Sequence, residues 1–207
     1  MPGTRGSNGF GARAQAFTLE AVVASVVVLG SLLFALQVAG VTSLTASTSN
    51  QQILDQQGAV AAGVLDAAAT EGSLGPTLRY WDNETRRFHR LPTGVDRAFY
   101  TVGPPTAFGS LLNETLDDRN VVFNVNLRWI DANGTVDRTP LVRGGQPSDD
   151  ASRATRTVAL YDTDRLLDAD GTRSDTTLAN ASFYASDRYP DGALYNVVRV
   201  EVVVWRV

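Results

Sequence analysis

The feature that most constrains this chain is a long stretch without charge near its N-terminus. No Asp, Glu, Lys or Arg occurs from residue 21 to residue 54, and residues 21–36 are strongly apolar, with a weaker continuation to about residue 41. A helix needs about 20 consecutive apolar residues to span a bilayer, whereas the apolar core of a secretory signal peptide has only about 7 to 15. The stretch therefore predicts one membrane-length helix over about residues 17–41.

The charges on either side of this stretch predict its orientation. Arg5 and Arg13 precede it, and no positive charge follows it until Arg79. Positive residues collect on the cytoplasmic side of membrane helices. We therefore expect a single-pass protein of the cell membrane, with a cytoplasmic N-terminus and an extracellular C-terminal domain.

An amphipathic helical segment is expected over about residues 50–70, because its apolar residues fall broadly on one helical face, which would pack on the following domain. Ser49 and Gln52 have the spacing of a capping box. Either a second helix begins there, or one helix runs unbroken over residues 17–70. The helical pattern stops at Gly72 and the Gly75-Pro76 breaker.

After Pro76 the apolar pattern changes from a period of 3.6 to a period of 2, which predicts β-strands. The clearest strands are residues 120–130 and 195–207, and Asn133-Gly134 offers a tight hairpin turn after the first of them. Weaker strands are expected at 78–81, 87–91, 98–102 and 156–162, and loops at 103–119, 143–154 and 163–194. The predicted fold class is α+β, a long N-terminal apolar helix followed by an antiparallel β-sheet domain.

The charged residues are unusual in kind. All 18 basic residues are Arg, and Asp outnumbers Glu by 17 to 5. Short carboxylates hold water and stay soluble at high ionic strength, where the Debye length falls to about 3 Å at 1 M salt. This balance resembles that of proteins from salt-loving archaea. A GC-rich genome alone also favours Arg over Lys, but it favours Asp over Glu less strongly.

Charge and cysteine content exclude several classes of function. The formal net charge of −4 argues against a nucleic-acid partner, because binding phosphates needs clustered positive charge. The densest basic cluster, Arg86, Arg87 and Arg90 around Phe88, fits a solvated face. The chain has no cysteine, so disulfides, thiolate catalysis and thiolate metal sites are absent.

The sequence offers little that catalysis could use. No Ser-His-Asp, zinc-ligand or phosphate-loop arrangement surrounds the only histidine, His89. The neighbouring acids Asp117-Asp118 and Asp149-Asp150 diverge in a strand or loop and need not share a proton. We expect no enzyme activity and no cofactor.

One acidic stretch, Asp168-Ala169-Asp170-Gly171, has the alternating oxygen ligands and the glycine that begin a calcium loop. The Glu that would close such a loop is missing. A hydrated acidic loop is the favoured interpretation, and no metal is expected, with calcium at Asp168 and Asp170 as the weak alternative.

The segment before the apolar stretch reads Arg13-Ala14-Gln15-Ala16-Phe17-Thr18-Leu19-Glu20, and an apolar helix is expected to follow it. This arrangement resembles the processing region of type IV pilins and archaeal pilin-like proteins. Residues 17–20 resemble the family's Phe-Thr-Leu-Ile-Glu start with the Ile missing, and Arg13 matches the basic residue upstream of the cut. In that family a membrane-bound aspartic prepilin peptidase removes a short leader on the cytoplasmic side, and the apolar helix stays on the mature protein.

The resemblance implies three parts: a leader over residues 1–14, an N-terminal helix over 15–72 and an extracellular β-rich domain over 77–207. The processing region would be Arg13, Ala14, Gln15, Ala16 and Phe17. Two cleavage bonds remain open. The bacterial pattern, which has Gly before the cut, would cut between Gln15 and Ala16 and make Glu20 the fifth residue, whereas archaeal patterns would cut between Ala14 and Gln15.

The resemblance also implies a role for Glu20. An unpaired carboxylate near lipid is expensive, but in a bundle of such helices it can reach the new α-amino group of a neighbouring subunit and set the axial register. The implied partners are a prepilin peptidase, other pilin-like subunits and the membrane. The alternative is a single-pass, membrane-anchored surface-binding or envelope protein that is neither processed nor polymerised, with Glu20 at the headgroup level.

Four Asn-x-Ser/Thr sequons follow the helix, at Asn83, Asn113, Asn133 and Asn180. In an exported protein each is a potential N-glycan acceptor on exposed backbone. Asn133 is the least certain of the four, because a hairpin turn already explains it.

Overall fold

The computed structural model describes residues 8–91, 98–116 and 121–206, and within the first helix it describes side chains at 20–37, 52 and from 54 onward. The chain divides into two compact units, Met1–Gln52 and Ile53–Val207. One helix, α1 (Asn8–Thr70), contributes residues to both units. Among the described residues the second unit has ten further helices and strands, which are given below.

Helix α1 already begins at Asn8, inside the predicted leader, and its backbone continues through Ser49 and Gln52. Of the two possibilities that the sequence left open, the structure therefore has the single unbroken helix. It ends in a Schellman motif, in which Gly72 has a φ of +71°, Gly72 N–H donates to Ala69 O at 3.2 Å and Ser73 N–H donates to Ala68 O at 2.9 Å.

The second unit consists of short helices and antiparallel strands. In chain order these are α2 (Leu74–Leu78), β1 (Trp81–Asp82), β2 (Arg87–Phe88), α3 (Ala107–Leu116), β3 (Val121–Ile130), β4 (Val136–Arg143), β5 (Ser152–Tyr161), β6 (Arg165–Leu167), β7 (Arg173–Thr177) and β8 (Leu194–Arg206), with a 3-10 turn at Leu178–Asn180. The main sheet has the strand order β4-β3-β8-β5, and β1-β2 and β6-β7 form separate pairs. These elements confirm the predicted α+β fold.

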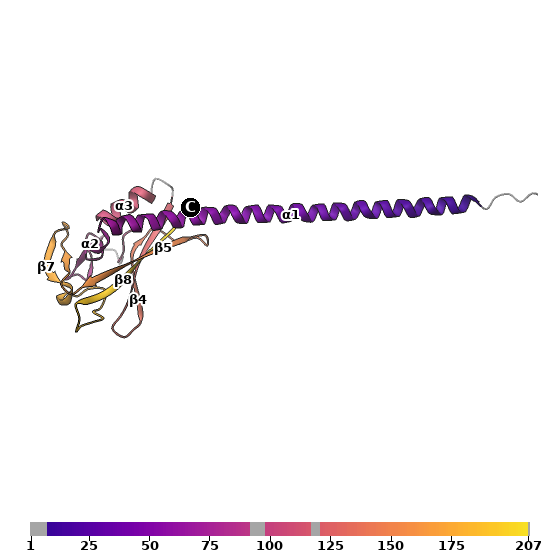
Figure 1. Cartoon of the computed structure of the whole chain (residues 1–207). Coiled ribbons are helices and arrows are strands. Elements are labelled where there is room, and N and C mark those ends of the chain that lie inside the picture. Colours follow the sequence, from indigo (N-terminus) through magenta and orange to yellow (C-terminus); the bar gives the residue numbers. More distant parts are fainter. Residues whose placement is uncertain (1–7, 92–97, 117–120, 207) are drawn as a thin grey trace, which may run out of the picture. The chain divides into compact units, whose positions relative to one another are not determined.

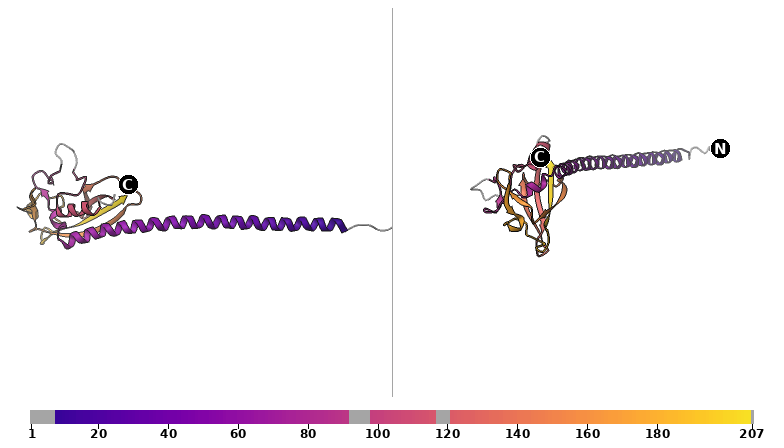
Figure 2. Two further views of the ribbon diagram at one scale, coloured as in Figure 1. Left: turned by 90° about the horizontal axis from the view of Figure 1, so that it is seen from above. Right: turned by 60° about the vertical axis from the view of Figure 1, so that its left-hand side comes forward.

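One face of the main sheet is covered by helices. The C-terminal part of α1 runs alongside the sheet (Figures 1 and 2) and buries Ala61, Val64, Leu65 and Ala68. Helix α3 adds three buried side chains, described below. They pack against the alternating apolar residues of the central strands, which are Val125, Leu127, Val198, Val200 and Val202. This burial of apolar area is the main term that holds the unit together.

Two polar contacts tie the end of α1 to the edge strand β5. The Ser152 hydroxyl donates to Leu54 O at 2.7 Å, and Arg156 forms an ion pair with Asp66 at 2.7 Å. They fix the position of the helix along the strand within this unit.

Helix α3 lies in a segment that the sequence analysis expected to be a loop, and that expectation is wrong for residues 107–116. Pro104, Pro105 and two glycines favour a loop locally, but Phe108, Leu112 and Leu116 recur at intervals of four and are all buried. The glycines serve close packing, since a Cβ on Gly109 would lie 1.8 Å from Pro104 O. Tertiary burial overrides the local signal here.

Other expected loops and strands also differ from the structure. The segment 163–194 contains β6, β7 and the 3-10 turn, and β5 begins at Ser152, inside the expected loop 143–154. The expected strand at 98–102 is a single bridge between Tyr100 and Val142. At 78–81 the chain leaves α2 and enters β1 only at Trp81. These elements are too short, or too polar, for an alternating pattern to mark them.

Candidate functional site

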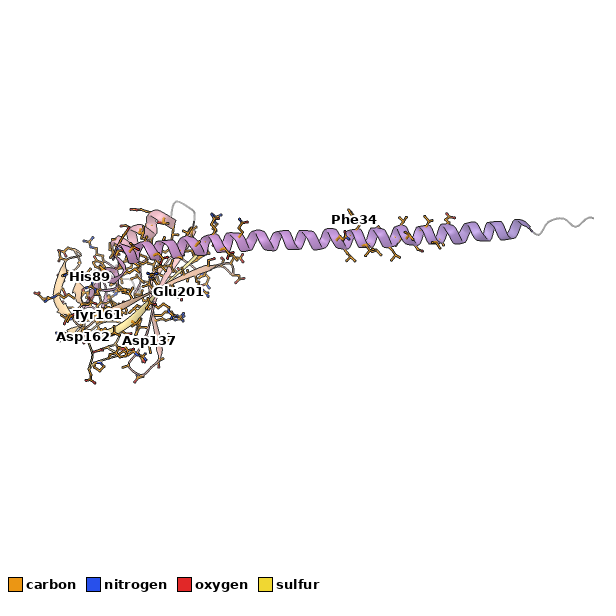
Figure 3. All side chains as sticks on the ribbon, in the orientation of Figure 1. Phe34, His89, Asp137, Tyr161, Asp162 and Glu201 are labelled. Atoms are coloured by element: carbon orange, nitrogen blue, oxygen red, sulfur yellow. The ribbon has the colours of Figure 1, made fainter. Side chains whose placement is uncertain are left out.

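The most unusual surface in the described chain is the apolar segment Glu20–Gln37 of α1. Every described side chain in it is exposed, including Phe34, which projects from the helix in Figure 3. The large apolar residues among them are Val22, Val23, Val26, Val27, Val28, Leu29, Leu32, Leu33, Phe34 and Leu36. So large an apolar surface is not stable in water and marks a site that lipid or another protein covers. By length and composition the segment is one candidate membrane-spanning helix.

The polar side chains inside this segment are satisfied by the helix itself. The Ser25 hydroxyl donates to Ala21 O at 2.7 Å, and the Ser31 hydroxyl donates to Val28 O at 2.8 Å. A hydroxyl that bonds to a carbonyl three or four residues earlier needs no water. Both serines can therefore lie in lipid or against another helix without an unpaired donor.

Glu20 is the only charged residue of the apolar segment. Its side chain is exposed, and among the described residues it has no hydrogen-bond or ion-pair partner. The predicted processing residues, Arg13, Ala14, Gln15, Ala16 and Phe17, lie on the helical backbone just before it, but their side chains are outside the described residues. The cleavage bond stays a prediction.

Two of the four sequons lie on open surface. Asn133 is exposed in the β3–β4 turn, where Asp131 Oδ1 accepts hydrogen bonds from the backbone N–H groups of Asn133 and Thr135 at 2.9 and 2.7 Å. Asn180 is exposed at the end of the 3-10 turn, and its Nδ2 donates to Thr177 Oγ1 at 3.1 Å. The hairpin that seemed to explain Asn133 therefore also presents it to solvent.

The other two sequons are half-buried and hold loops in place. Asn83 Oδ1 accepts from Ser182 N–H at 2.6 Å, and Asn113 Oδ1 accepts from Gly103 N–H at 2.8 Å. A glycan is attached at the amide nitrogen of an accessible asparagine, so the glycan prediction is strongest for the two exposed asparagines, Asn133 and Asn180.

The only histidine has a structural place. His89 Nε2 lies 2.8 Å from Leu167 O, its ring packs on Tyr80 with the centroids 5.0 Å apart, and its backbone carbonyl accepts from the Tyr100 hydroxyl. The flanking Arg86 and Arg90 have positive φ values of 54° and 56°, which mark tight turns on both sides of β2. The geometry therefore gives His89 a role in packing β1-β2 against β6.

The predicted weak calcium stretch is the turn between β6 and β7. Asp170 Oδ1 accepts from Thr172 N–H at 2.9 Å and from the Thr172 hydroxyl at 2.7 Å, and these bonds hold the pKa of Asp170 below its usual value. Gly171 follows with a φ of +88°. The turn accounts for these residues without a metal ion. Within residues 8–91, 98–116 and 121–206 no three His, Asp or Glu side chains gather in a way that would hold a metal.

Only one of the two acidic pairs lies among the described residues. Asp149 and Asp150 are exposed in the turn before β5. Asp117 and Asp118 lie outside the described residues.

An aromatic cluster that the sequence analysis missed holds the long segment before β8. Trp81 lies at the centre, with Phe88, Phe183 and Tyr184 at centroid distances of 5.0, 6.1 and 5.3 Å, and Trp81 Nε1 donates to Ser182 O at 2.9 Å. Burial raises the pKa of Tyr184 well above its usual value. No spacing rule links these residues, so only their aromatic character could have hinted at the cluster.

Tyr195 anchors the same segment from β8. Its hydroxyl donates to Ala185 O at 2.8 Å. Burial raises the pKa of Tyr195 to about 12, and the nearby carboxylates of Asp187 and Asp162 add to the increase.

The fold and the site together define an α+β protein with one candidate membrane-spanning helix near its N-terminus and an antiparallel β unit after it. The chain belongs to a family of unknown function, DUF7288, which matches residues 13–204. The match therefore includes the predicted processing region, the apolar segment and nearly all of the β unit. No curated protein and no solved structure matches the chain significantly.

Proposed function

We propose that this protein is a structural, pilin-like subunit. In this proposal Glu20–Gln37 inserts the precursor into the cell membrane, a prepilin peptidase removes the leader, and the same helix then assembles with other subunits into a type IV pilus-like surface filament or a related secretion machine. The observation that carries the proposal is the fully exposed apolar segment Glu20–Gln37, whose single carboxylate, at its start, has no partner among the described residues.

The position of Glu20 favours assembly over simple anchoring. Cleavage before Gln15 or Ala16 would create an α-amino group four or five residues ahead of it, about 6 to 8 Å along the helix axis. The amino group of one subunit can then meet Glu20 of a neighbour that is shifted by about one helical turn. Such a pair is stronger between packed apolar helices than in water, because the local dielectric is low.

The β unit fits an extracellular location. Its exposed sequons at Asn133 and Asn180 become glycan acceptors only in an exported protein. The acidic, lysine-free composition suits the high external salt of a salt-loving archaeon. His89 has a role in packing and Asp170 a role in a turn, and neither gives a reason to propose an enzyme.

Substitution of Glu20 tests the proposal. We expect Glu20→Gln to leave the protein in the membrane fraction and its leader removed, but to reduce its recovery in sheared surface filaments at least tenfold, since a neutral amide cannot pair with an α-amino group. Glu71→Gln, at an exposed position after the end of α1, is the matched control. Filament recovery unchanged by Glu20→Gln would contradict the proposal.

A second candidate is a single-pass surface or envelope protein that never polymerises. The same exposed apolar segment supports it, because lipid alone could cover that surface. This candidate predicts an intact leader and a Glu20→Gln variant that behaves like the unaltered protein in every fraction.

A further inference from the structure

The second face of the main sheet carries three arginines side by side. Arg128 on β3 lies directly opposite Arg138 on β4 and directly opposite Arg199 on β8. Directly paired residues of antiparallel strands point to the same face. We call Arg138, Arg128 and Arg199 the arginine row.

The arginine row is only partly neutralised by the protein itself. Arg128 pairs with Glu201 at 3.2 Å, and the strand register places Glu201 on the same face. Among the described residues no carboxylate is within ion-pair distance of Arg138 or Arg199. Like charges directly opposite each other destabilise a sheet, and the chain as a whole is acidic, with a net charge of −4. A row of this kind is best explained by an anionic partner.

Apolar side chains lie beside the arginine row. Ile130, Val136 and Val197 are 39%, 61% and 38% exposed, and Ile130 lies directly opposite Val136. Together with Arg128 and Arg199 they line a shallow groove of about 360 Å³. The partner should therefore combine acidic groups with a small apolar one.

The other end of the same face is covered by the chain itself. Asn124 Oδ1 accepts from the N–H groups of Gly144 and Gly145 at 2.8 and 3.3 Å, which folds the segment after β4 over the sheet. A Cβ on Gly145 would lie 3.4 Å from the Trp205 ring, and Trp205 is buried. The groove therefore lies on a part of this face that the segment after β4 does not cover.

We propose that the arginine row and the apolar residues beside it bind the β6–β7 turn of a second copy of this chain. This inference rests on the proposed function, which brings copies together. The turn presents Asp168 and Asp170, both exposed and without an ion pair among the described residues, with Ala169 between them. Two unpaired guanidinium groups would meet two unpaired carboxylates, and the Ala169 methyl group would meet the apolar side chains.

The turn suits this role because it is held in one shape. Thr172 donates two hydrogen bonds to Asp170, and Asp168 N–H donates to Thr172 O at 2.9 Å. Less conformational entropy is lost when such a turn binds. Since the turn and the groove share no residue, each copy can use both, and a contact of this kind joins subunits head to tail into a ring or an open chain.

Cysteine cross-linking in the full-length protein tests the contact, because the native chain has no cysteine. Val136→Cys and Ala169→Cys chains, produced together in the membranes of the native host and treated with a short bismaleimide, should give a cross-linked pair containing one chain of each kind. Ser110→Cys, exposed on α3, replaces Val136→Cys in the control and should give only background. Cross-linking at the control level, or from Val136→Cys to itself or to another protein, would overturn the proposal.

Charge reversal adds a second readout. Arg138→Glu with Arg199→Glu in the Val136→Cys chain should reduce the cross-link about tenfold, and Asp168→Arg with Asp170→Arg in the Ala169→Cys chain should restore it. If the arginine reversal reduces the cross-link and the aspartate reversal does not restore it, the proposal is overturned. If the charge-reversed chains fail to fold, the cross-link between Val136→Cys and Ala169→Cys alone tests the proposal. If the cross-link forms in chains that keep their leader, the proposed function is contradicted and this inference is not. If filaments form without the cross-link, this inference is contradicted and the proposed function is not.

Discussion

The two ends of helix α1 differ in where their partners come from. Beyond Ile53 the helix has one buried face, and Leu65 and Ala68 lie fully inside the β unit. Over Glu20–Gln37 the same helix exposes every described side chain, although this part is the more apolar of the two. The part beyond Ile53 is covered within the chain, whereas Glu20–Gln37 requires lipid or another protein to cover it.

The largest expected effect comes from truncating a residue on the part beyond Ile53. Leu65→Ala should lower the free energy of unfolding of the β unit by about 2 to 5 kcal/mol, because it removes buried methyl groups and leaves a cavity. Leu33→Ala, on the exposed part, should change it by less than about 0.5 kcal/mol. Chemical unfolding of the full chain in detergent micelles, followed by tryptophan fluorescence, measures both. Equal effects of the two substitutions on the free energy of unfolding would contradict the difference between the two parts of the helix.

A charge in the apolar segment should have the next largest effect. Leu29→Arg places a guanidinium near the middle of the candidate span, which costs about 2.5 to 3.5 kcal/mol in membrane insertion. We expect most of the variant to leave the membrane fraction. Ala62→Arg, at an exposed position on the other part of the helix, serves as the control and should stay. Retention of both variants would mean that the segment does not lie in lipid.

A smaller effect is expected from alkaline pH on the β unit. Below about pH 10 Tyr195 is neutral in both states, but between pH 10 and about 12 it ionises in the unfolded chain and stays neutral in the folded one. The free energy of unfolding should therefore fall by about 1.4 kcal/mol per pH unit for this group across that range. Tyr195→Phe should remove this part of the slope. An identical slope in the variant would contradict the assignment.

The smallest expected effect concerns the ion pair between Arg156 and Asp66. Both side chains are largely exposed, at 49% and 65%, so Asp66→Asn should cost about 1 kcal/mol or less. The loss should shrink further in 1 M salt, where the Debye length is about 3 Å. Melting temperatures at low and high salt check this. A large loss would mean that the helix end depends on charge more than on burial.

How much the sequence predicts depends on how far apart the relevant residues lie. The alternating patterns at 120–130 and 195–207 predict β3 and β8 closely, and the glycine at 72 predicts the end of α1. Helix α3 was missed because Pro104 and Gly109 imitate a loop, although Gly109 is needed for close packing. Strand β6 was missed because three residues are too few to show a period, and β7 was missed because its five residues are all polar.

The proposed functional residues likewise differ in how far apart they lie in the sequence. Glu20 and the apolar segment are continuous in sequence, so their pattern is visible without coordinates. The arginine row joins three strands through the sheet register, and no single segment shows that Arg128 lies between Arg138 and Arg199. The exposure of Asn133 and the packing of Asn113 likewise depend on tertiary structure.

The central claim is that the N-terminal helix becomes free for assembly after the leader is removed. N-terminal peptide mapping by mass spectrometry, on protein recovered from the membrane or surface fraction of its native host, tests it most directly. The proposed function predicts a mature protein that starts at Gln15, Ala16 or Phe17. A protein that retains residues 1–14, or one that starts beyond about residue 40, would contradict it.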